Sequence, residues 1–143
     1  MTDFTIESAD RLRRSIGDIV RAMQQLENAP NGQIETLGFL RRDGRQSIAS
    51  LARRRRVKHQ SMSGAIVELE SQGLVVRTPD PLDGRGVLID LTEAGSAMVD
   101  ESRTRRSAIV LRVAERTLTQ SEQDALAGTA ALLDKLRDGL LSE

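Results

Sequence analysis

The sequence predicts a mainly α-helical protein with one small β-hairpin, on three observations. Apolar residues recur every three or four positions along most of the 143 residues, which is typical of amphipathic helices. Two short apolar runs, at 74–77 and 87–91, flank a stretch rich in proline and glycine and predict a hairpin. Basic residues are concentrated between residues 41 and 58, ahead of the hairpin. The expected order is four helices, two strands and two helices.

Capping and breaking residues set the limits of the first three helices. Apolar residues spaced from Ile6 to Leu26 predict a long first helix, which the breaker-rich residues 28–32 end. A short second helix around Ile34–Leu40 is stopped by Asp43-Gly44. Ser47 is a suitable N-cap for a third helix.

Similar signals limit the later elements. A fourth helix begins after Val57, and Gly73 suits its C′ position. The hairpin follows, with a tip that includes Asp83-Gly84. Thr92 can cap a long fifth helix, and Thr119 with Glu122 forms a capping box for the last one. We expect one domain over 1–143, with a central part at 33–92 and flanking helical parts at 1–31 and 93–143.

Composition excludes several classes of site. The chain has no cysteine and one histidine, which excludes disulfides and thiolate metal sites and makes a metal or cofactor unexpected. It has no signal-peptide or membrane-spanning segment, so a cytoplasmic protein is expected. Two phenylalanines are its only aromatic residues, which disfavours base stacking on single strands and favours duplex DNA.

Charge is distributed unevenly along a chain whose net charge is zero. Residues 41–58 contain eight basic residues and one acidic residue, a net charge of +7, so the remainder carries −7. Clustered positive charge binds polyanions because it releases condensed counterions. The third and fourth helices with the hairpin form a winged helix-turn-helix, whose second helix would enter the major groove. The plainer alternative is an amphipathic helix in a bundle.

Candidate DNA contacts fall into three groups. The polar start of the fourth helix would contact bases through Lys58, His59, Gln60, Ser61 and Ser63. Consecutive arginines point in different directions, so only some of the run 53–56 can reach phosphate; the candidates are Arg45, Arg53, Arg54 and Arg56. Alternatively, this run is a solvated helix face or a nuclear-import signal.

The hairpin tip supplies the third group. Arg85 is a candidate minor-groove residue, and Asp83 would shape the turn or orient Arg85. The alternative is an arginine in solvent. A calcium site is rejected because the carboxylates lack the spacing of a calcium-binding loop.

The first and the last two helices carry more apolar residues than one small winged domain can cover. A two-fold homodimer is expected to bury them, and it would bind a pseudo-palindrome with half-sites about 10 bp apart. The expected interface residues are Ile6, Leu12, Ile16, Leu132, Leu133, Leu136 and Leu140.

The chain resembles the MarR (multiple antibiotic resistance regulator) family over essentially its whole length. The matching motifs are Leu51-Ala52, Ser61-Met62-Ser63, Leu69-Glu70, Gly73-Leu74-Val75-x-Arg77, Asp80-Pro81-x-Asp83-Gly84-Arg85 and Leu91-Thr92-x-x-Gly95. The resemblance implies a homodimeric, sequence-specific regulator, usually a repressor, with an interface formed by the first, fifth and sixth helices. It also implies release of DNA by a small, often aromatic, effector, bound in a crevice between the dimerisation and DNA-binding parts.

Three positions depart from the family pattern. Arg55-Arg56 stands where the family usually has Leu-Gly, Lys58 where it has a capping Ser or Thr, and Gly64 where it often has a base-reading side chain. Two rival classes remain. A winged helix used only for protein contacts would carry mixed charge on the fourth helix and wing, and an enzyme would need clustered acid–base, nucleophilic or cofactor-binding residues.

Overall fold

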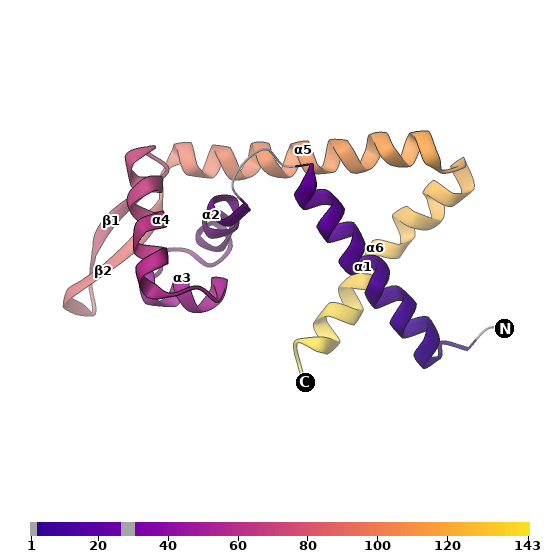
Figure 1. Cartoon of the computed structure of the whole chain (residues 1–143), viewed down its shortest axis with the longest axis horizontal. Coiled ribbons are helices and arrows are strands. Elements are labelled where there is room, and N and C mark those ends of the chain that lie inside the picture. The colour runs from indigo at the N-terminus through magenta and orange to yellow at the C-terminus, as the bar shows by residue number, and fades with distance from the viewer. Residues whose placement is uncertain (1–2, 27–30) are drawn as a thin grey trace. The chain divides into compact units, whose positions relative to one another are not determined.

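The computed structural model describes residues 3–26 and 31–143 (Figure 1). Their elements are α1 Ile6–Gln25, α2 Asn31–Asp43, α3 Ile48–Arg55, α4 His59–Ser71, β1 Val75–Asp80, β2 Asp83–Leu91, α5 Glu93–Thr117 and α6 Gln120–Leu140. This order confirms the expected fold class. Residues 1–102 and 103–143 form two compact units. Most of the expected breaker 28–32 lies outside the described residues.

The predicted caps are present. Ser47 accepts a hydrogen bond from the backbone N–H of Ser50 at 3.1 Å and begins α3. Thr119 and Glu122 form a reciprocal capping box at the start of α6. Gly73 has a φ of +73° immediately after α4, the left-handed conformation that glycine adopts without steric cost. Local sequence therefore determines these helix ends.

Thr92 joins the end of α4 to the start of α5. Its hydroxyl donates to the carbonyl of Gly73 at 2.6 Å and accepts from the N–H of Gly95 at 3.1 Å. A Cβ on Gly95 would collide with the backbone carbonyl of Leu74, so only glycine allows this close approach of α5. The hairpin is thus attached firmly to the first turns of α5.

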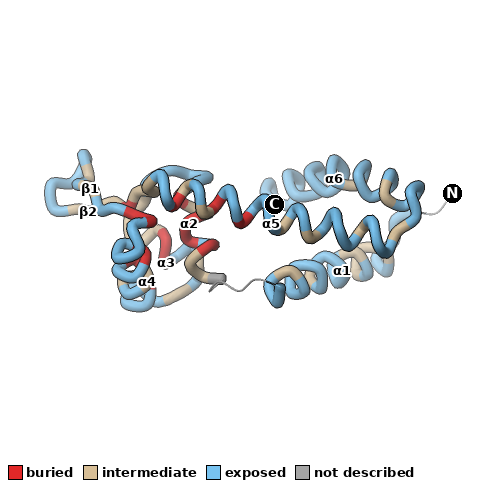
Figure 2. Tube along the Cα trace, turned by 90° about the horizontal axis from the view of Figure 1, so that it is seen from above, coloured by how far each residue is buried: buried red, intermediate tan, exposed pale blue. Residues whose placement is uncertain are grey.

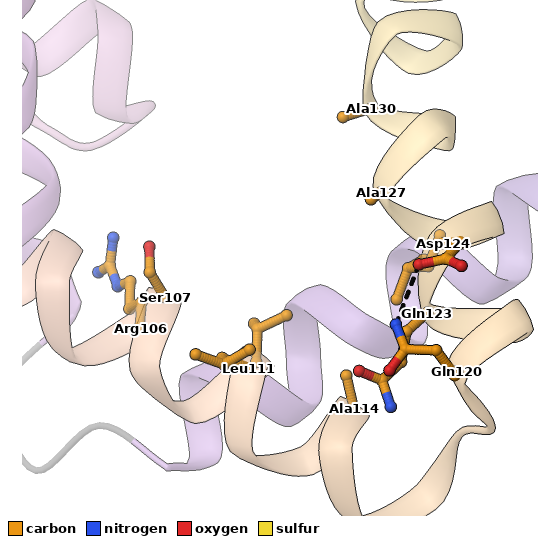
Figure 3. A pocket seen from close by; sticks show the side chains of 11 residues that line it. Arg106, Ser107, Leu111, Ala114, Gln120, Gln123, Asp124, Ala127 and Ala130 are labelled. Carbon is orange, nitrogen blue, oxygen red and sulfur yellow. Dashed lines mark hydrogen bonds between the residues drawn. The ribbon is translucent and has the colours of Figure 1, made fainter.

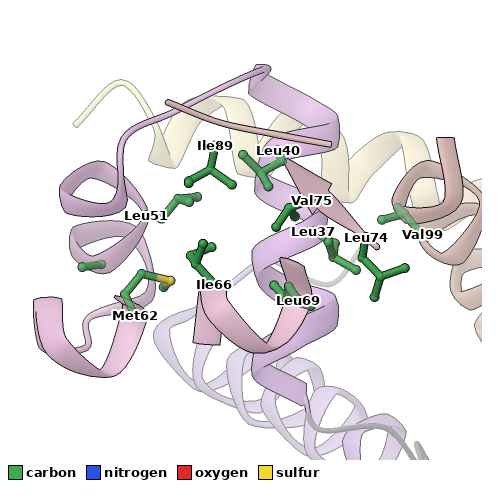
Figure 4. Close-up of a cluster of buried hydrophobic side chains, with 11 residues drawn as sticks. Leu37, Leu40, Leu51, Met62, Ile66, Leu69, Leu74, Val75, Ile89 and Val99 are labelled. Atoms are coloured by element: carbon green, nitrogen blue, oxygen red, sulfur yellow. The ribbon is translucent and has the colours of Figure 1, made fainter. Parts of the chain in front are cut away.

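The hydrophobic core of the first unit lies under the helix-turn-helix. It is formed by α2, α3, α4, the hairpin and the start of α5 (Figure 4). Its fully buried apolar side chains are Leu37, Leu51, Met62, Ile66, Leu69 and Ile89. The burial fixes which face of α4 turns away from the core. Figure 2 shows that buried residues concentrate in this part of the chain.

The hairpin is longer than expected. Strands β1 and β2 pair antiparallel from Val75–Leu91 to Pro79–Val87, and the next pair is Asp80–Asp83. The tip therefore consists of Pro81 and Leu82, and the expectation that the tip extends to Asp83-Gly84 is wrong. Residues 84–86 bulge out of the ladder, because three residues of β2 lie between two consecutive pairs.

The long helices bury little within one chain. Neither α1 nor α6 contains a buried residue. In the second unit, a short connection joins α5 to α6, and the side-chain amide of Gln123 donates to the carbonyl of Leu118 at 3.1 Å there. No helix in the described part of the chain is long and apolar enough to cross a membrane.

Candidate nucleic-acid interface

The start of α4 presents the expected base-contacting residues to solvent. Lys58 is the N-cap residue, and its side chain makes no capping hydrogen bond. His59, Gln60 and Ser61 are exposed, whereas Met62 is buried. Ser63 is half-buried, and its hydroxyl lies 3.5 Å from Nδ1 of His59. The backbone N–H groups of this first turn carry the positive end of the helix dipole, which suits a phosphate.

The side chain of Arg54 is held in place by contacts with other residues of the chain. Its guanidinium pairs with the Asp43 carboxylate and donates to Oε1 of Gln46 at 3.2 Å. It also lies over the ring of Phe39, with Cζ 4.5 Å from the ring centroid. The hydrogen bond from Arg54 lowers the pKa of Asp43 below its ordinary value of 3.8. This cluster ties α3 to the end of α2.

Arg55 takes the place of the apolar residue that the resemblance leads one to expect. Its side chain is 19% exposed, and its Nε lies 3.8 Å from the carboxylate of Glu35. A Cβ on Gly32 would collide with the guanidinium, so the absence of a side chain at Gly32 makes room for it. Arg55 therefore fills space between α2 and α3.

Arg56 stands where the resemblance leads one to expect glycine, and it adopts a left-handed backbone conformation. It has a φ of +55°, the only positive φ of a non-glycine residue in the described part of the chain. Its N–H donates to the carbonyl of Arg53 at 3.2 Å, and the N–H of Val57 to that of Ala52 at 3.0 Å. The turn between α3 and α4 is thus closed by backbone hydrogen bonds and carries backbone strain at Arg56.

The other expected phosphate contacts are exposed. Arg45, Arg53 and Arg56 extend into solvent, and within residues 3–26 and 31–143 none of them forms an ion pair. Sequence reasoning grouped Arg54 with them. It missed the cluster of Arg54, Phe39 and Gln46, which depends on contacts between separate elements.

The bulge places Arg85 at the end of the wing. Its N–H donates to the carboxylate of Asp83 at 3.1 Å, so Asp83 shapes the backbone here. The Asp80 carboxylate similarly accepts from the N–H of Leu82 at 2.9 Å. Leu82, at the tip, is 95% exposed. Both carboxylates are therefore hydrogen-bonded to the wing's own backbone, and Arg85 supplies the positive charge at this end.

Similarity to known proteins agrees with this geometry. The sequence profile of the MarR family matches residues 28–86. The uncharacterized HTH-type transcriptional regulator Mb0904 of Mycobacterium bovis is 37% identical over 107 residues, which cover 74% of this chain and 73% of that protein. This chain belongs to the MarR family. It is a transcriptional regulator with a DNA-binding winged helix, and its relatives are named as regulators, not enzymes.

Two further comparisons are consistent with this family assignment. The HTH-type transcriptional repressor NicR of Pseudomonas putida is 38% identical over 68 residues, which cover 48% of this chain and 43% of NicR. The crystal structure of the transcriptional regulator Tm0710 of Thermotoga maritima superposes with a TM-score of 0.78 at 20% identity, covering 96% of this chain and 99% of that one. The second comparison shows the fold alone.

The departures from the MarR pattern change side chains while the fold is kept. Arg55 and Arg56 stand where the resemblance leads one to expect an apolar residue and a glycine, and Arg56 ends α3 in a left-handed conformation. Lys58 begins α4 without a side-chain cap. Among the described residues, no group of three or more His, Asp or Glu side chains could hold a metal ion.

Proposed function

We propose that this protein is a homodimeric transcriptional repressor that binds a pseudo-palindromic operator in double-stranded DNA. The observation that carries the proposal is the exposed polar start of α4, accompanied in the same unit by exposed arginines and by the Arg85 bulge. In a winged helix-turn-helix, the corresponding parts contact bases, phosphates and the minor groove. Arg45, Arg53 and Arg56 would hold phosphates, because none of them is occupied by an internal ion pair among the described residues.

Exposed apolar residues on the long helices support the homodimer. Ile6 on α1 is 84% exposed, and Leu12 and Ile16 follow it on the same helix. Leu132, Leu133, Leu136 and Leu140 form an exposed stripe on α6. A two-fold partner would cover these side chains and contribute roughly 25 cal/mol for each Å² of apolar surface removed from water.

A groove of about 650 Å³ between the end of α5 and α6 adds to this apolar surface (Figure 3). Its floor includes Leu111, Ala114 and Ala127, and Gln120 donates to the carboxylate of Asp124 at 3.0 Å beside it. An open groove whose exposed lining is mostly apolar, with polar side chains such as Arg106 and Gln123 among it, suits a helix of a second copy better than an enclosed ligand. We therefore assign it to the dimer interface.

Repression and effector release extend the proposal to regulation. NicR is named as a repressor, which supports repression as the direction of control here. A small-molecule effector would bind the dimer and favour a state in which the two recognition helices no longer match successive half-sites. The protein would act in the cytoplasm of a bacterium or archaeon, on the nucleoid.

The test combines DNA selection with sedimentation. Purified protein is expected to enrich genomic fragments that carry an inverted repeat with half-sites about one helical turn apart. Sedimentation is expected to show a dimer at micromolar concentration and one dimer per operator. A monomer bound one protomer at a time would contradict the homodimer. Failure to retain any fragment at low salt would instead favour a winged helix that contacts only proteins.

A further inference from the structure

The face of α4 that points away from the core has a glycine at its centre and no long charged side chain beside it in the first two and a half turns. Met62, Ile66 and Leu69 are fully buried and define the inner face. With 3.6 residues per turn, Gln60, Gly64 and Val67 lie on the opposite side at positions i, i+4 and i+7. Gln60 is exposed and Val67 is 56% exposed. These three residues form an outward stripe along the first two and a half turns of α4.

Nothing in the described part of the chain requires a glycine at position 64. A Cβ at this position would meet no atom within 4 Å, and its φ is not positive. Glycine in a helix interior is unfavourable relative to alanine, so the fold would gain stability from a side chain here. A bare backbone at the centre of the stripe is, however, useful where another molecule approaches closely.

The chemistry of the stripe selects among base pairs. After Lys58, α4 contains no arginine or lysine, so it lacks the side chains that bind guanine O6 and N7 most often. A glutamine can instead form paired hydrogen bonds with N6 and N7 of adenine, and an apolar side chain can contact the methyl group of thymine. His59 and Ser63 lie against each other on the flank of the stripe.

The acidic half of α4 limits how far the helix can reach into a groove. Glu68 accepts a hydrogen bond from Gln72 at 3.0 Å, and Glu70 pairs with Arg77 at 3.3 Å. Carboxylates in this part of the helix would be repelled by phosphates. The base-contacting segment therefore ends near Val67.

We propose that Gln60, Gly64 and Val67 read adenine–thymine pairs in the major groove. Gln60 binds the adenine edge, Val67 contacts a thymine methyl group, and Gly64 lets the helix backbone approach the bases between them. This inference rests on the proposed DNA-binding function and adds the class of base pair that each half-site contains.

The experiment uses one random duplex library amplified in two forms, with thymidine or with deoxyuridine triphosphate. Uracil lacks only the methyl group of thymine. The wild-type protein is expected to enrich sequences from the thymine library with adenine–thymine pairs at fixed positions of each half-site. Replacing thymine by uracil in an enriched duplex is expected to weaken binding about fourfold, the value of one buried methyl group.

Three variants assign the effect to the stripe. Val67→Ala is expected to bind the thymine and uracil duplexes equally. The shorter alanine side chain does not reach the thymine methyl group, and uracil has no methyl group to contact. Gln60→Ala is expected to bind the enriched duplex about 5- to 150-fold more weakly and random DNA almost normally. Gly64→Ala is expected to raise the Tm while weakening binding, the opposite of what loss of a structural glycine would do. Arg53→Ala is the control and is expected to weaken binding to both libraries alike, with a salt slope lower by about one.

The outcomes separate the two proposals. If the wild-type protein enriches nothing from either library, the proposed DNA-binding function fails. If it enriches a sequence that binds equally as thymine and uracil duplexes, or if Val67→Ala retains a preference for thymine, DNA binding stands and the assignment of the stripe is overturned.

Discussion

The winged part of the chain and the long helices differ in how they bury apolar side chains. Leu51, Met62 and Ile66 of the winged part are fully inaccessible, and the core continues into the hairpin. On α6, by contrast, Leu132 and Leu140 are about two-thirds exposed, and α1 has no buried residue. One part has a complete core of its own, and the other presents its apolar face to solvent.

This difference separates two origins of stability. The winged part can bury its apolar surface without help, so its shape does not depend on protein concentration. Under our proposal, α1 and α6 reach comparable burial only in a dimer, whose stability follows mass action. In such a dimer, the DNA-contacting elements would belong to the independent part, and the spacing between the two copies of them would depend on the concentration-dependent part.

The largest expected effect is on the free energy of unfolding, when a leucine of the core and a leucine of α6 are each replaced by alanine. Leu51→Ala in the core is expected to reduce the free energy of unfolding by about 2–5 kcal/mol, because it leaves a cavity that the neighbouring side chains do not fill. Leu136→Ala removes the same atoms from a side chain that is 43% exposed in one chain. Urea unfolding at two protein concentrations distinguishes them: the loss is the same at both concentrations for Leu51→Ala, and for Leu136→Ala it is larger at the higher concentration, where the wild-type dimer is populated. Equal behaviour of the two variants would remove the distinction between the regions.

The next effect concerns the wing. Arg85→Ala is expected to weaken operator binding by about 1–3 kcal/mol and to leave the Tm and the dimer unchanged, because an exposed residue contributes little to folding. Arg85→Lys is expected to restore only part of the loss, since a planar guanidinium suits a narrow minor groove better than a hydrated ammonium. Titrations on one operator at matched salt measure both. Unchanged affinity in Arg85→Ala would mean that the wing does not enter the groove.

A smaller effect is expected at the turn between α3 and α4. Arg56 holds a left-handed conformation that costs an L-residue roughly 1–2 kcal/mol, so Arg56→Gly is expected to stabilise the fold by about 1 kcal/mol. If Arg56 also contacts phosphate, the same variant is expected to bind DNA more weakly, with a salt slope lower by about one. Thermal unfolding and salt titration test the two effects separately. A lower Tm would show that the arginine side chain stabilises the turn.

Sequence predicts this molecule best where structure depends on neighbours along the chain. Ser47, Gly73 and Thr119 are correctly placed because caps and left-handed turns involve residues within one helical turn. The sequence misplaces the hairpin tip because Asp83-Gly84 is a strong local turn signal. The register instead fixes Pro81 and Leu82 as the turn and puts the extra residues into a bulge.

The candidate site shows the same limit. The polar start of α4 could be found from helical periodicity, which also separates Gln60 from Met62. The separate roles of Arg54 and Arg55 could not, because they depend on Phe39 and Gly32, which belong to α2. Four consecutive arginines look alike in sequence, and contacts with another helix are what distinguish them.

The smallest effect is expected at Asp43, the only acidic residue among residues 41–58. The hydrogen bond from Arg54 lowers its pKa in the folded protein, so the stability it contributes is present above its ordinary value of 3.8 and is lost as the pH falls through the lower folded value. The difference in free energy of unfolding between wild type and Asp43→Asn should therefore be larger at pH 6 than at pH 3.

Asp43→Asn is also expected to bind random DNA more tightly. It removes one negative charge from the basic segment and frees Arg54, which the carboxylate otherwise holds beside Phe39. Arg54→Lys is the matched control, because it keeps the charge but loses the planar stack and the paired donors. If the Asp43→Asn variant is less stable and binds DNA more tightly and with a steeper salt dependence, Asp43 stabilises the attachment of α3 to α2 and lowers the affinity for DNA. Unchanged binding would mean that Arg54 lies outside the DNA interface even when its carboxylate partner is gone.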